Sequence, residues 1–164
     1  MASPDFPSRS FDRTLDAFVY NDAGRKAAGF KGEADDCVTR AIAIAAQLRY
    51  REIYDALNRI AKLEKFARGR IGFMAATGRG SSARTGVLKP TYKQFLTARG
   101  WTWTPTMFVG QGCKVHLRGE ELPQGRLIVS CSRHLVAVID GIVHDTHDST
   151  RDGTRCVYGY WSRS

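Results

Sequence analysis

Three side chains that lie far apart in the sequence have the types needed for a thiol-based nucleophilic site. Cys37 follows the pair Asp35-Asp36, and His134 and Asp145 come about a hundred residues later. A thiol attacks as its thiolate, which a helix N-terminus and a nearby imidazolium both stabilise. His134 would supply the imidazolium and then donate a proton to the leaving group, while Asp145 would orient the ring and stabilise its charged form. We therefore predict a Cys-His-Asp triad from these residues.

A β-hairpin would place the imidazole beside the carboxylate. Asp140-Gly141 stands between two apolar runs, and this dipeptide is typical of a two-residue type I′ turn. Such a turn pairs Ile139 with Ile142, which puts His134 and Asp145 on one face of the hairpin as diagonal neighbours, within reach of a hydrogen bond. The register therefore favours Asp145 over the turn residue Asp140 as the partner of the histidine.

The thiol needs a helix that begins at Cys37. Asp35 or Asp36 is a suitable N-cap, because its carboxylate can accept hydrogen bonds from the free N–H groups of the first turn. The next residues have the apolar period of a helix, at Val38, Ala41, Ile42 and Ala45. A second helix is predicted over residues 50–65, and a third from Pro90 to Gly100 with Tyr92, Phe95 and Leu96 facing inward.

Strand patterns dominate the second half of the chain. Alternating or apolar runs predict strands over residues 18–20, 101–103, 114–118, 126–130, 135–139, 142–146 and 155–161. Helices followed by strands indicate an α+β fold, with N-terminal helices packed on a C-terminal antiparallel sheet. A length of 164 residues fits one domain, 1–164, in which the polar residues 1–16 form a flexible arm.

The composition favours a cytoplasmic protein without a membrane span. Hydrophobic residues make up 43% of the chain, but no window approaches eighteen uninterrupted apolar residues. The N-terminus carries no secretory signal, so the four cysteines are expected to be thiols, and a Cys131–Cys156 disulfide would require export by another route. No Cys-x-x-Cys spacing is present, which argues against a zinc ribbon.

The net charge of +9 is concentrated in one segment. Between Arg59 and Lys93 there are nine lysines and arginines and a single acid. Within it, residues 67–89 are rich in glycine and lack a sustained period, which predicts a mobile basic loop. This loop would bind acidic substrates or other anions through Arg68, Arg70, Arg79 and Arg84.

Two other functions compete with the thiol site. His134, Asp145 and His147 share a face and could bind zinc with Cys37, and Cys113 with His116 is a second candidate pair. Neither set has an established ligand spacing, so we predict no metal and no cofactor. The basic loop could instead hold nucleic-acid phosphates while Trp101, Trp103 or Tyr92 stacks on bases. Cys37 would then be a buried apolar residue of the helix.

The order of these motifs resembles the papain-like cysteine peptidase superfamily. Asp35-Asp36-Cys37 opens a helix, and His134 and Asp145 follow on successive strands. The order is similar to that of the small bacterial branch that includes bacteriocin-processing peptidases, and to small proteins of bacteria and phages. The resemblance implies a helix packed on an antiparallel sheet with the active site between them, and a thiol hydrolase acting on a peptide or related acyl bond of a protein or peptide substrate.

The same resemblance implies a role for each site residue. Cys37 would be the nucleophile, His134 the base and Asp145 the orienting acid, and the backbone N–H of Cys37 would be one oxyanion donor. Papain-like enzymes usually carry a glutamine as a second donor about six residues before the cysteine, where this chain has Lys31. Asn21 is the candidate substitute. The superfamily also contains inactive relatives, so an inactive papain-like binding module is the alternative.

Overall fold

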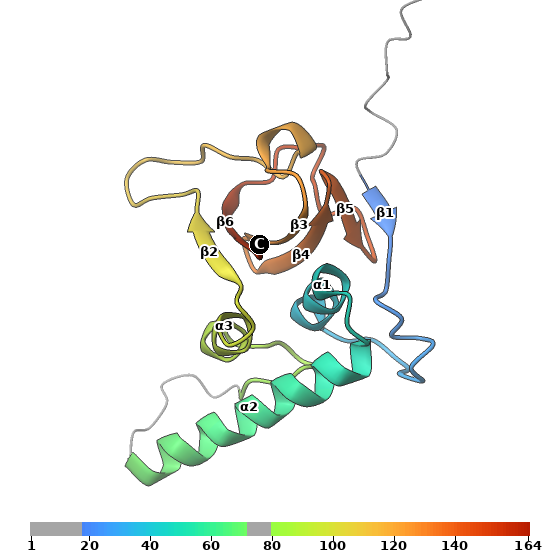
Figure 1. Ribbon diagram of the computed structural model, residues 1–164, viewed down its shortest axis with the longest axis vertical. Helices are drawn as coiled ribbons and strands as arrows, with labels where there is room; N and C mark the ends of the chain where they lie inside the picture. Colours follow the sequence, from blue (N-terminus) through green and yellow to red (C-terminus); the bar gives the residue numbers. More distant parts are fainter. Residues whose placement is uncertain (1–17, 72–79) are drawn as a thin grey trace, which may run out of the picture.

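The computed structural model describes residues 18–71 and 80–164 of the chain (Figure 1). In this part the chain forms an α+β fold with three α-helices and one six-stranded sheet. The elements in chain order are β1 (Phe18–Tyr20), α1 (Cys37–Ala46), α2 (Tyr50–Ile71), α3 (Lys89–Thr97), β2 (Thr102–Pro105), the 3₁₀ helix η1 (Gly119–Glu121), β3 (Arg126–Cys131), β4 (His134–Ile139), β5 (Ile142–Asp145) and β6 (Val157–Ser162).

The sheet is mixed rather than antiparallel. Its strand order is β1-β5-β4-β3-β6-β2, and every neighbouring pair is antiparallel except β1 and β5. The predicted C-terminal antiparallel sheet is therefore correct for β2 to β6 and wrong for the whole sheet. The N-terminal strand β1 joins the edge in the parallel direction, and the chain between β1 and β5 is long enough for that crossover.

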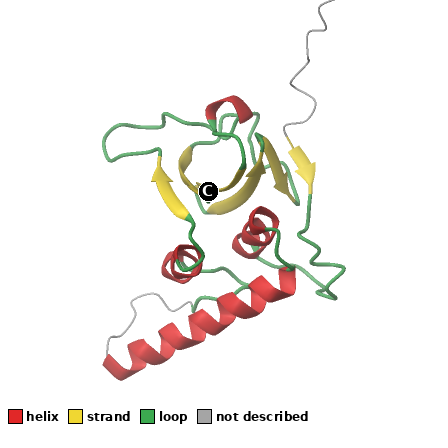
Figure 2. Cartoon of the chain, viewed as in Figure 1, coloured by secondary structure: helices red, strands yellow, loops and turns green. Residues whose placement is uncertain are grey.

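The strands curl so that one face of the sheet encloses apolar side chains and the other packs on helices. Figures 1 and 2 show α1, α2 and α3 gathered on one side of the strands. Leu127, Val129, Val136, Val138 and Val143 fill the enclosed face, whereas the alternate residues Ile128, Leu135 and Ala137 belong to the core shared with the helices. This alternation follows from the two-residue period of strands.

Helix α1 lies at the centre of the core. Eight of its ten residues are buried, and it contacts β4 and α2. A helix surrounded in this way needs apolar residues on nearly all sides, and α1 has them apart from Thr39 and Arg40. Burial of a charged side chain at position 40 requires partners, which the site supplies.

The predicted hairpin is present. Ile139 pairs with Ile142, and the turn residues Asp140 and Gly141 have φ of 48° and 84°. Both values are positive, as a type I′ turn requires. The register therefore brings the start of β4, at His134, beside the end of β5, at Asp145.

The prediction that all four cysteines are thiols was wrong, and so was the strand predicted over residues 114–118. Cys113 forms a disulfide with Cys156, so Cys37 and Cys131 are the thiols. Residues 114–118 form no strand and make one isolated bridge, between His116 and Cys156. That bridge brings the two cysteines to a Cα separation of 5.8 Å, which suits a disulfide. Sequence spacing could not show this contact, because 43 residues separate the two positions.

The basic loop is shorter than predicted. Helix α2 continues to Ile71, and residues 80–88 include a bridge between Ser82 and Gly86. Ala83 is fully buried there, where its N–H donates to Asn58 on α2 and its carbonyl accepts from Thr39 on α1. These contacts hold the segment against both helices. Residues 72–79 of the expected loop, and the expected arm 1–16, lie outside the described residues.

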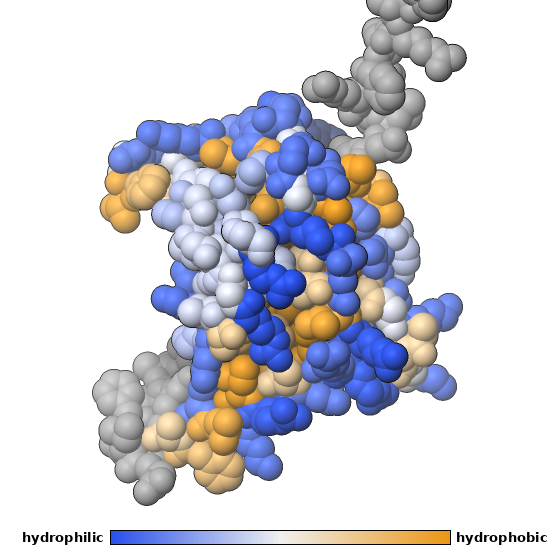
Figure 3. All heavy atoms as spheres, viewed as in Figure 1, coloured by the Kyte–Doolittle hydropathy of each residue, from blue (hydrophilic) through white to orange (hydrophobic). Residues whose placement is uncertain are grey.

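The loop between β2 and η1 extends away from the sheet. Met107, Phe108 and Val109 are exposed there, and apolar surface is visible at this position in Figure 3. The Cys113–Cys156 disulfide ties the far side of the loop to the chain just before β6. Within residues 18–71 and 80–164, no helix has both the length and the apolar character needed to cross a bilayer.

Replacing Gly141 with Ala should lower the free energy of unfolding by about 1–3 kcal/mol, because positive φ strains an L side chain. A Cβ at this position would also lie 3.0 Å from the Cα of Gly119. Asp140→Asn is the matched control, since Asn tolerates the left-handed conformation and keeps the oxygen that accepts the Gly125 N–H. Urea unfolding measures all three proteins, and equal midpoints would contradict the importance of this turn.

Candidate active site

The thiol of Cys37 lies at the N-terminus of α1, as predicted, but the helix is capped differently. Asp36 is the N-cap residue, and its carboxylate makes no capping hydrogen bond to the first-turn N–H groups. That carboxylate instead bonds to the side chains of Arg40 and Tyr50. The N–H groups of the first turn therefore keep their partial positive charge near Cys37, which favours a thiolate.

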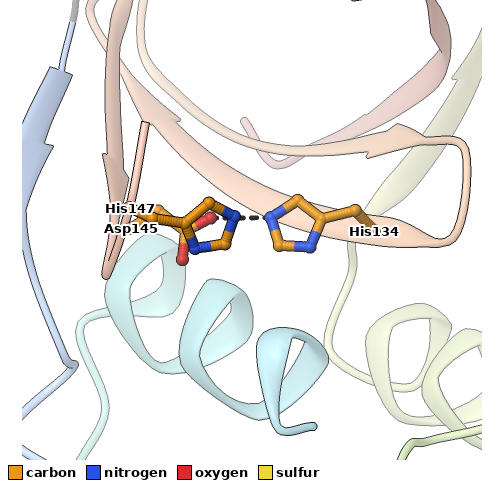
Figure 4. A group of neighbouring side chains, drawn as sticks. All are labelled: His134, Asp145 and His147. Carbon is orange, nitrogen blue, oxygen red and sulfur yellow. Dashed lines mark hydrogen bonds and ion pairs between the residues drawn. The ribbon is translucent and has the colours of Figure 1, made fainter. Parts of the chain in front are cut away.

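His134 and Asp145 are in direct contact. Figure 4 shows the imidazole of His134, at the start of β4, pointing toward the carboxylate of Asp145 at the end of β5. The His134 Nε2 to Asp145 Oδ2 distance is 2.6 Å. Because Nε2 is engaged by the carboxylate, Nδ1 is the ring nitrogen left for the thiol of Cys37.

The pKa values of Cys37 and His134 are shifted by each other and by Asp145. Burial would raise the pKa of the Cys37 thiol, but hydrogen bonds to the His134 side chain and to the backbone of Leu135 lower it overall. Burial would lower the pKa of His134, yet hydrogen bonds to Asp145 and Cys37 raise it to about 9. These opposite shifts favour a thiolate–imidazolium pair at neutral pH.

Asp145 is held as a carboxylate. Burial would raise its pKa, but the hydrogen bond and the charge of His134, the backbone N–H of Thr146 and the charge of Arg40 lower the pKa to about 2. The Thr146 N–H donates to Oδ1 at 2.7 Å, and Arg40 Nη2 donates to the same oxygen at 3.1 Å. One carboxylate oxygen is thus fixed by the protein, while the other faces the imidazole.

Arg40 connects the Asp145 carboxylate to Asp36 at the N-terminus of helix α1. Its guanidinium also forms an ion pair with Asp36, which accepts from Tyr50 Oη at 2.6 Å and lies 3.2 Å from Arg25 Nε. Asp36, Arg40 and Asp145 are all buried. Sequence reasoning did not single out Arg40. The available signal was a charged residue within an apolar helix stripe, four positions after an aspartate and so on the same face.

The site opens into a cavity of about 730 Å³. Cys37 and His134 line it, and so does Tyr92 from α3, which is largely buried. Arg133 and Lys89 also line the cavity, as does the exposed His147. A substrate entering this space would meet the thiol and the imidazole together.

Asn21, the predicted second oxyanion donor, is not at the cavity. Its amide Nδ2 lies 3.4 Å from Nδ1 of His144, and its Oδ1 accepts the N–H of Ala23. His144 and Asp145 are consecutive on β5, so their side chains point to opposite faces. The structure therefore turns the Asn21 amide away from the thiol.

Of the four predicted anion-binding arginines, Arg84 alone has a described side chain, and it does not line the cavity. Arg84 donates to the carbonyl oxygens of Lys31 and Glu33, so it braces the segment before α1. Arg68 and Arg70 belong to the end of α2, with side chains outside the described part of the structure, and Arg79 lies outside the described residues. The basic side chains that do line the cavity are Arg133, Lys89 and Arg40.

The candidate metal ligands His134, Asp145 and His147 lie together beside the thiol site. One ligand atom from each of His134, Asp145 and His147 lies within 4.8 Å of the other two. The second candidate pair, Cys113 and His116, is already engaged in other contacts. Cys113 is in the disulfide, and His116 contacts Glu121.

Comparison with models of known protein families, with curated proteins and with solved structures finds no match to this chain.

Replacing Arg40 with Gln should lower the free energy of unfolding by about 3–5 kcal/mol at pH 7, because it leaves buried carboxylates without their shared cation. The difference from wild type should shrink as the pH falls from about 4 toward 2. Asp145 has a pKa of about 2, below its ordinary value, so its contribution is present above pH 4 and is lost in this range. Urea unfolding at several pH values measures the effect.

Arg49→Gln is the control for this experiment, because Arg49 is an exposed arginine shortly after the same helix. It should change stability by less than about 0.5 kcal/mol. An Arg40→Gln protein as stable as this control at pH 7 would show that the buried ion pairs are not needed.

Proposed function

We propose that this protein is a papain-like thiol hydrolase that acts on a peptide or related acyl bond. The observation that carries the proposal is the double engagement of one imidazole. His134 bonds to the Asp145 carboxylate at 2.6 Å and contacts the thiol of Cys37, beside an open cavity. This is the arrangement of nucleophile, base and orienting group that acyl transfer requires.

The residues support a two-step reaction. The Cys37 thiolate would attack the carbonyl carbon, forming a C–S bond and moving the carbonyl electron pair onto oxygen. Collapse of this intermediate would break the bond to the leaving group, which takes the proton from the His134 imidazolium. A water molecule would then attack the thioester, with neutral His134 accepting its proton, and the released thiolate would regenerate the ion pair.

Charge on the carbonyl oxygen needs two donors. The backbone N–H of Cys37 is the first, since it lies in the unsatisfied first turn of α1. Tyr92 is our candidate for the second in place of Asn21, because it lines the same cavity. Burial raises the pKa of its hydroxyl and the charge of Cys37 raises it further, so the group remains a donor near neutral pH.

The cavity lining favours substrates with acidic side chains. Arg133 is exposed at the turn between β3 and β4, directly before His134, and Lys89 lies at the start of α3. Their cationic groups would attract a carboxylate near the bond that is cleaved.

A cytoplasmic location stays a prediction, and in a reducing compartment Cys113 and Cys156 would be thiols.

The alternative function, nucleic-acid binding, has less support from the described residues than the thiol hydrolase has. Trp101 and Trp161 are buried, and Trp103 packs against Trp161 with ring centroids 5.4 Å apart. These rings form part of the core and offer no platform on which bases could stack.

Iodoacetamide at pH 7 should alkylate Cys37 at least 10-fold faster than a free cysteine derivative, because more of it is thiolate. Cys131, whose pKa burial raises to about 11, should react slowest. The rate for Cys37 should reach half its maximum below pH 9.0, the ordinary thiol value. Mass spectrometry of alkylated peptides over time measures each site.

His134→Gln is the critical variant in this labelling experiment. Loss of the imidazolium should slow alkylation of Cys37 by at least 10-fold, whereas His116→Gln, a histidine outside the cavity, should leave the rate within about two-fold of wild type. A Cys37 that labels like the free thiol, or at the same rate without His134, contradicts the proposal.

Arg133→Asn should reduce the preference for acidic over basic fluorogenic peptides by about 2- to 5-fold in kcat/KM, the range of an exposed ion pair. Asn tolerates the φ of 54° found at this position, so the change removes charge without straining the turn. Arg151→Asn is the control, because Arg151 has a φ of 53° and does not line the cavity. Equal preference in both variants would exclude Arg133 as a specificity residue, and Cys37→Ala should abolish cleavage.

A further inference from the structure

His147 is a third polar side chain beside the predicted catalytic pair. It follows Asp145 by two residues, and Figure 4 shows its ring next to the Asp145 carboxylate and facing His134. The two imidazole centroids are 5.5 Å apart, and single ligand atoms of the three residues lie within 4.8 Å of one another. The ring of His147 is exposed, and its nitrogens make no hydrogen bond among the described residues. The proposed hydrolase mechanism does not use it.

These three groups match the ligands that Zn²⁺ prefers. Zinc binds imidazole nitrogen at about 2.0–2.1 Å and carboxylate oxygen at about 2.0–2.2 Å, so tetrahedral ligand atoms lie roughly 3.4 Å apart. His134 Nε2 and Asp145 Oδ2, which are 2.6 Å apart, would move apart to reach that value, and the His147 ring would move inward from its place within 4.8 Å of the other ligand atoms. His147 can supply the inward movement because its side chain is exposed, and an ion placed between His134 and Asp145 would open their hydrogen bond.

The surroundings of Asp145 leave one oxygen available to an ion. Its Oδ1 accepts from Arg40 Nη2 and from the N–H of Thr146, while Oδ2 faces the imidazole of His134. A carboxylate oriented in this way by outer contacts is typical of metal ligands. The cavity of about 730 Å³, which His134 and His147 line, provides an entry path.

We propose that His134, Asp145 and His147 form a site for a divalent transition-metal ion of the Zn²⁺ class, and that the bound ion switches off the thiol. The ion would replace the hydrogen bond between His134 Nε2 and Asp145 Oδ2. A metal-bound His134 cannot be the imidazolium that stabilises the Cys37 thiolate. Metal binding stands on these three ligands alone, and only its inhibitory effect rests on the proposed function.

Zinc binding is measured by competition between the full chain and a chromogenic chelator loaded with Zn²⁺. Wild type and Cys37→Ser should each bind one ion at the site, and His147→Gln should bind at least 10-fold more weakly. His144→Gln is the matched control, since His144 is on the same strand as Asp145 and points to the opposite face. Its affinity should equal that of wild type.

Several outcomes would overturn the site. Wild-type affinity no tighter than that of His147→Gln would remove His147 as a ligand. A loss of binding in Cys37→Ser, or in His144→Gln with binding kept in His147→Gln, would place the ion elsewhere. Circular dichroism of each variant establishes that it is folded before its affinity is compared.

The inhibitory effect is tested by the rate of Cys37 alkylation with and without Zn²⁺, each variant being compared with its own metal-free rate. Zinc should slow the alkylation of Cys37 at least 10-fold in wild type and less than two-fold in His147→Gln. The full rate should return after EDTA. Site-specific binding that leaves the alkylation rate unchanged overturns the switch. A Cys37 that is not activated without metal refutes the proposed hydrolase, while the binding isotherms still decide the metal site.

Discussion

A single buried guanidinium holds the candidate site to the fold. Arg40 lies on the central helix α1 and contacts both Asp36, at the start of that helix, and Asp145, at the end of β5. Three buried charges would each be costly alone, and they are tolerated because two carboxylates share one cation while Tyr50 and Arg25 satisfy the rest of Asp36. The helix and the hairpin are thereby linked at the point where their chemistry meets.

This link also determines the protonation states in the site. Arg40 helps to keep Asp145 ionised, ionised Asp145 favours the charged form of His134, and charged His134 lowers the pKa of Cys37. Burial acts strongly on the pKa of each group, and the hydrogen bonds and charges of the neighbouring residues together outweigh it. Any two of these groups without the others would lose most of these pKa shifts, because burial disfavours every charged form.

The prediction from sequence succeeded where short-range rules apply. A two-residue Asp140-Gly141 turn needs positive φ, and strand alternation then fixes which side chains share a face, so the contact of His134 with Asp145 could be derived. The start of α1 at Cys37 followed from apolar periodicity. The class, α+β, followed from the order of helical and strand patterns. Assignment to the papain-like superfamily stays a proposal.

Other features depend on segments that meet only in the folded chain. The parallel pairing of β1, the Cys113–Cys156 disulfide, the docking of Ala83 on two helices and the turn of Asn21 toward His144 all join positions distant in sequence. Local propensity carries no information about such contacts, because burial and charge pairing are decided by the packed core. The sequence by itself therefore determined which residues have the chemistry and which local elements carry them, and only the tertiary structure decided that Arg40 unites them.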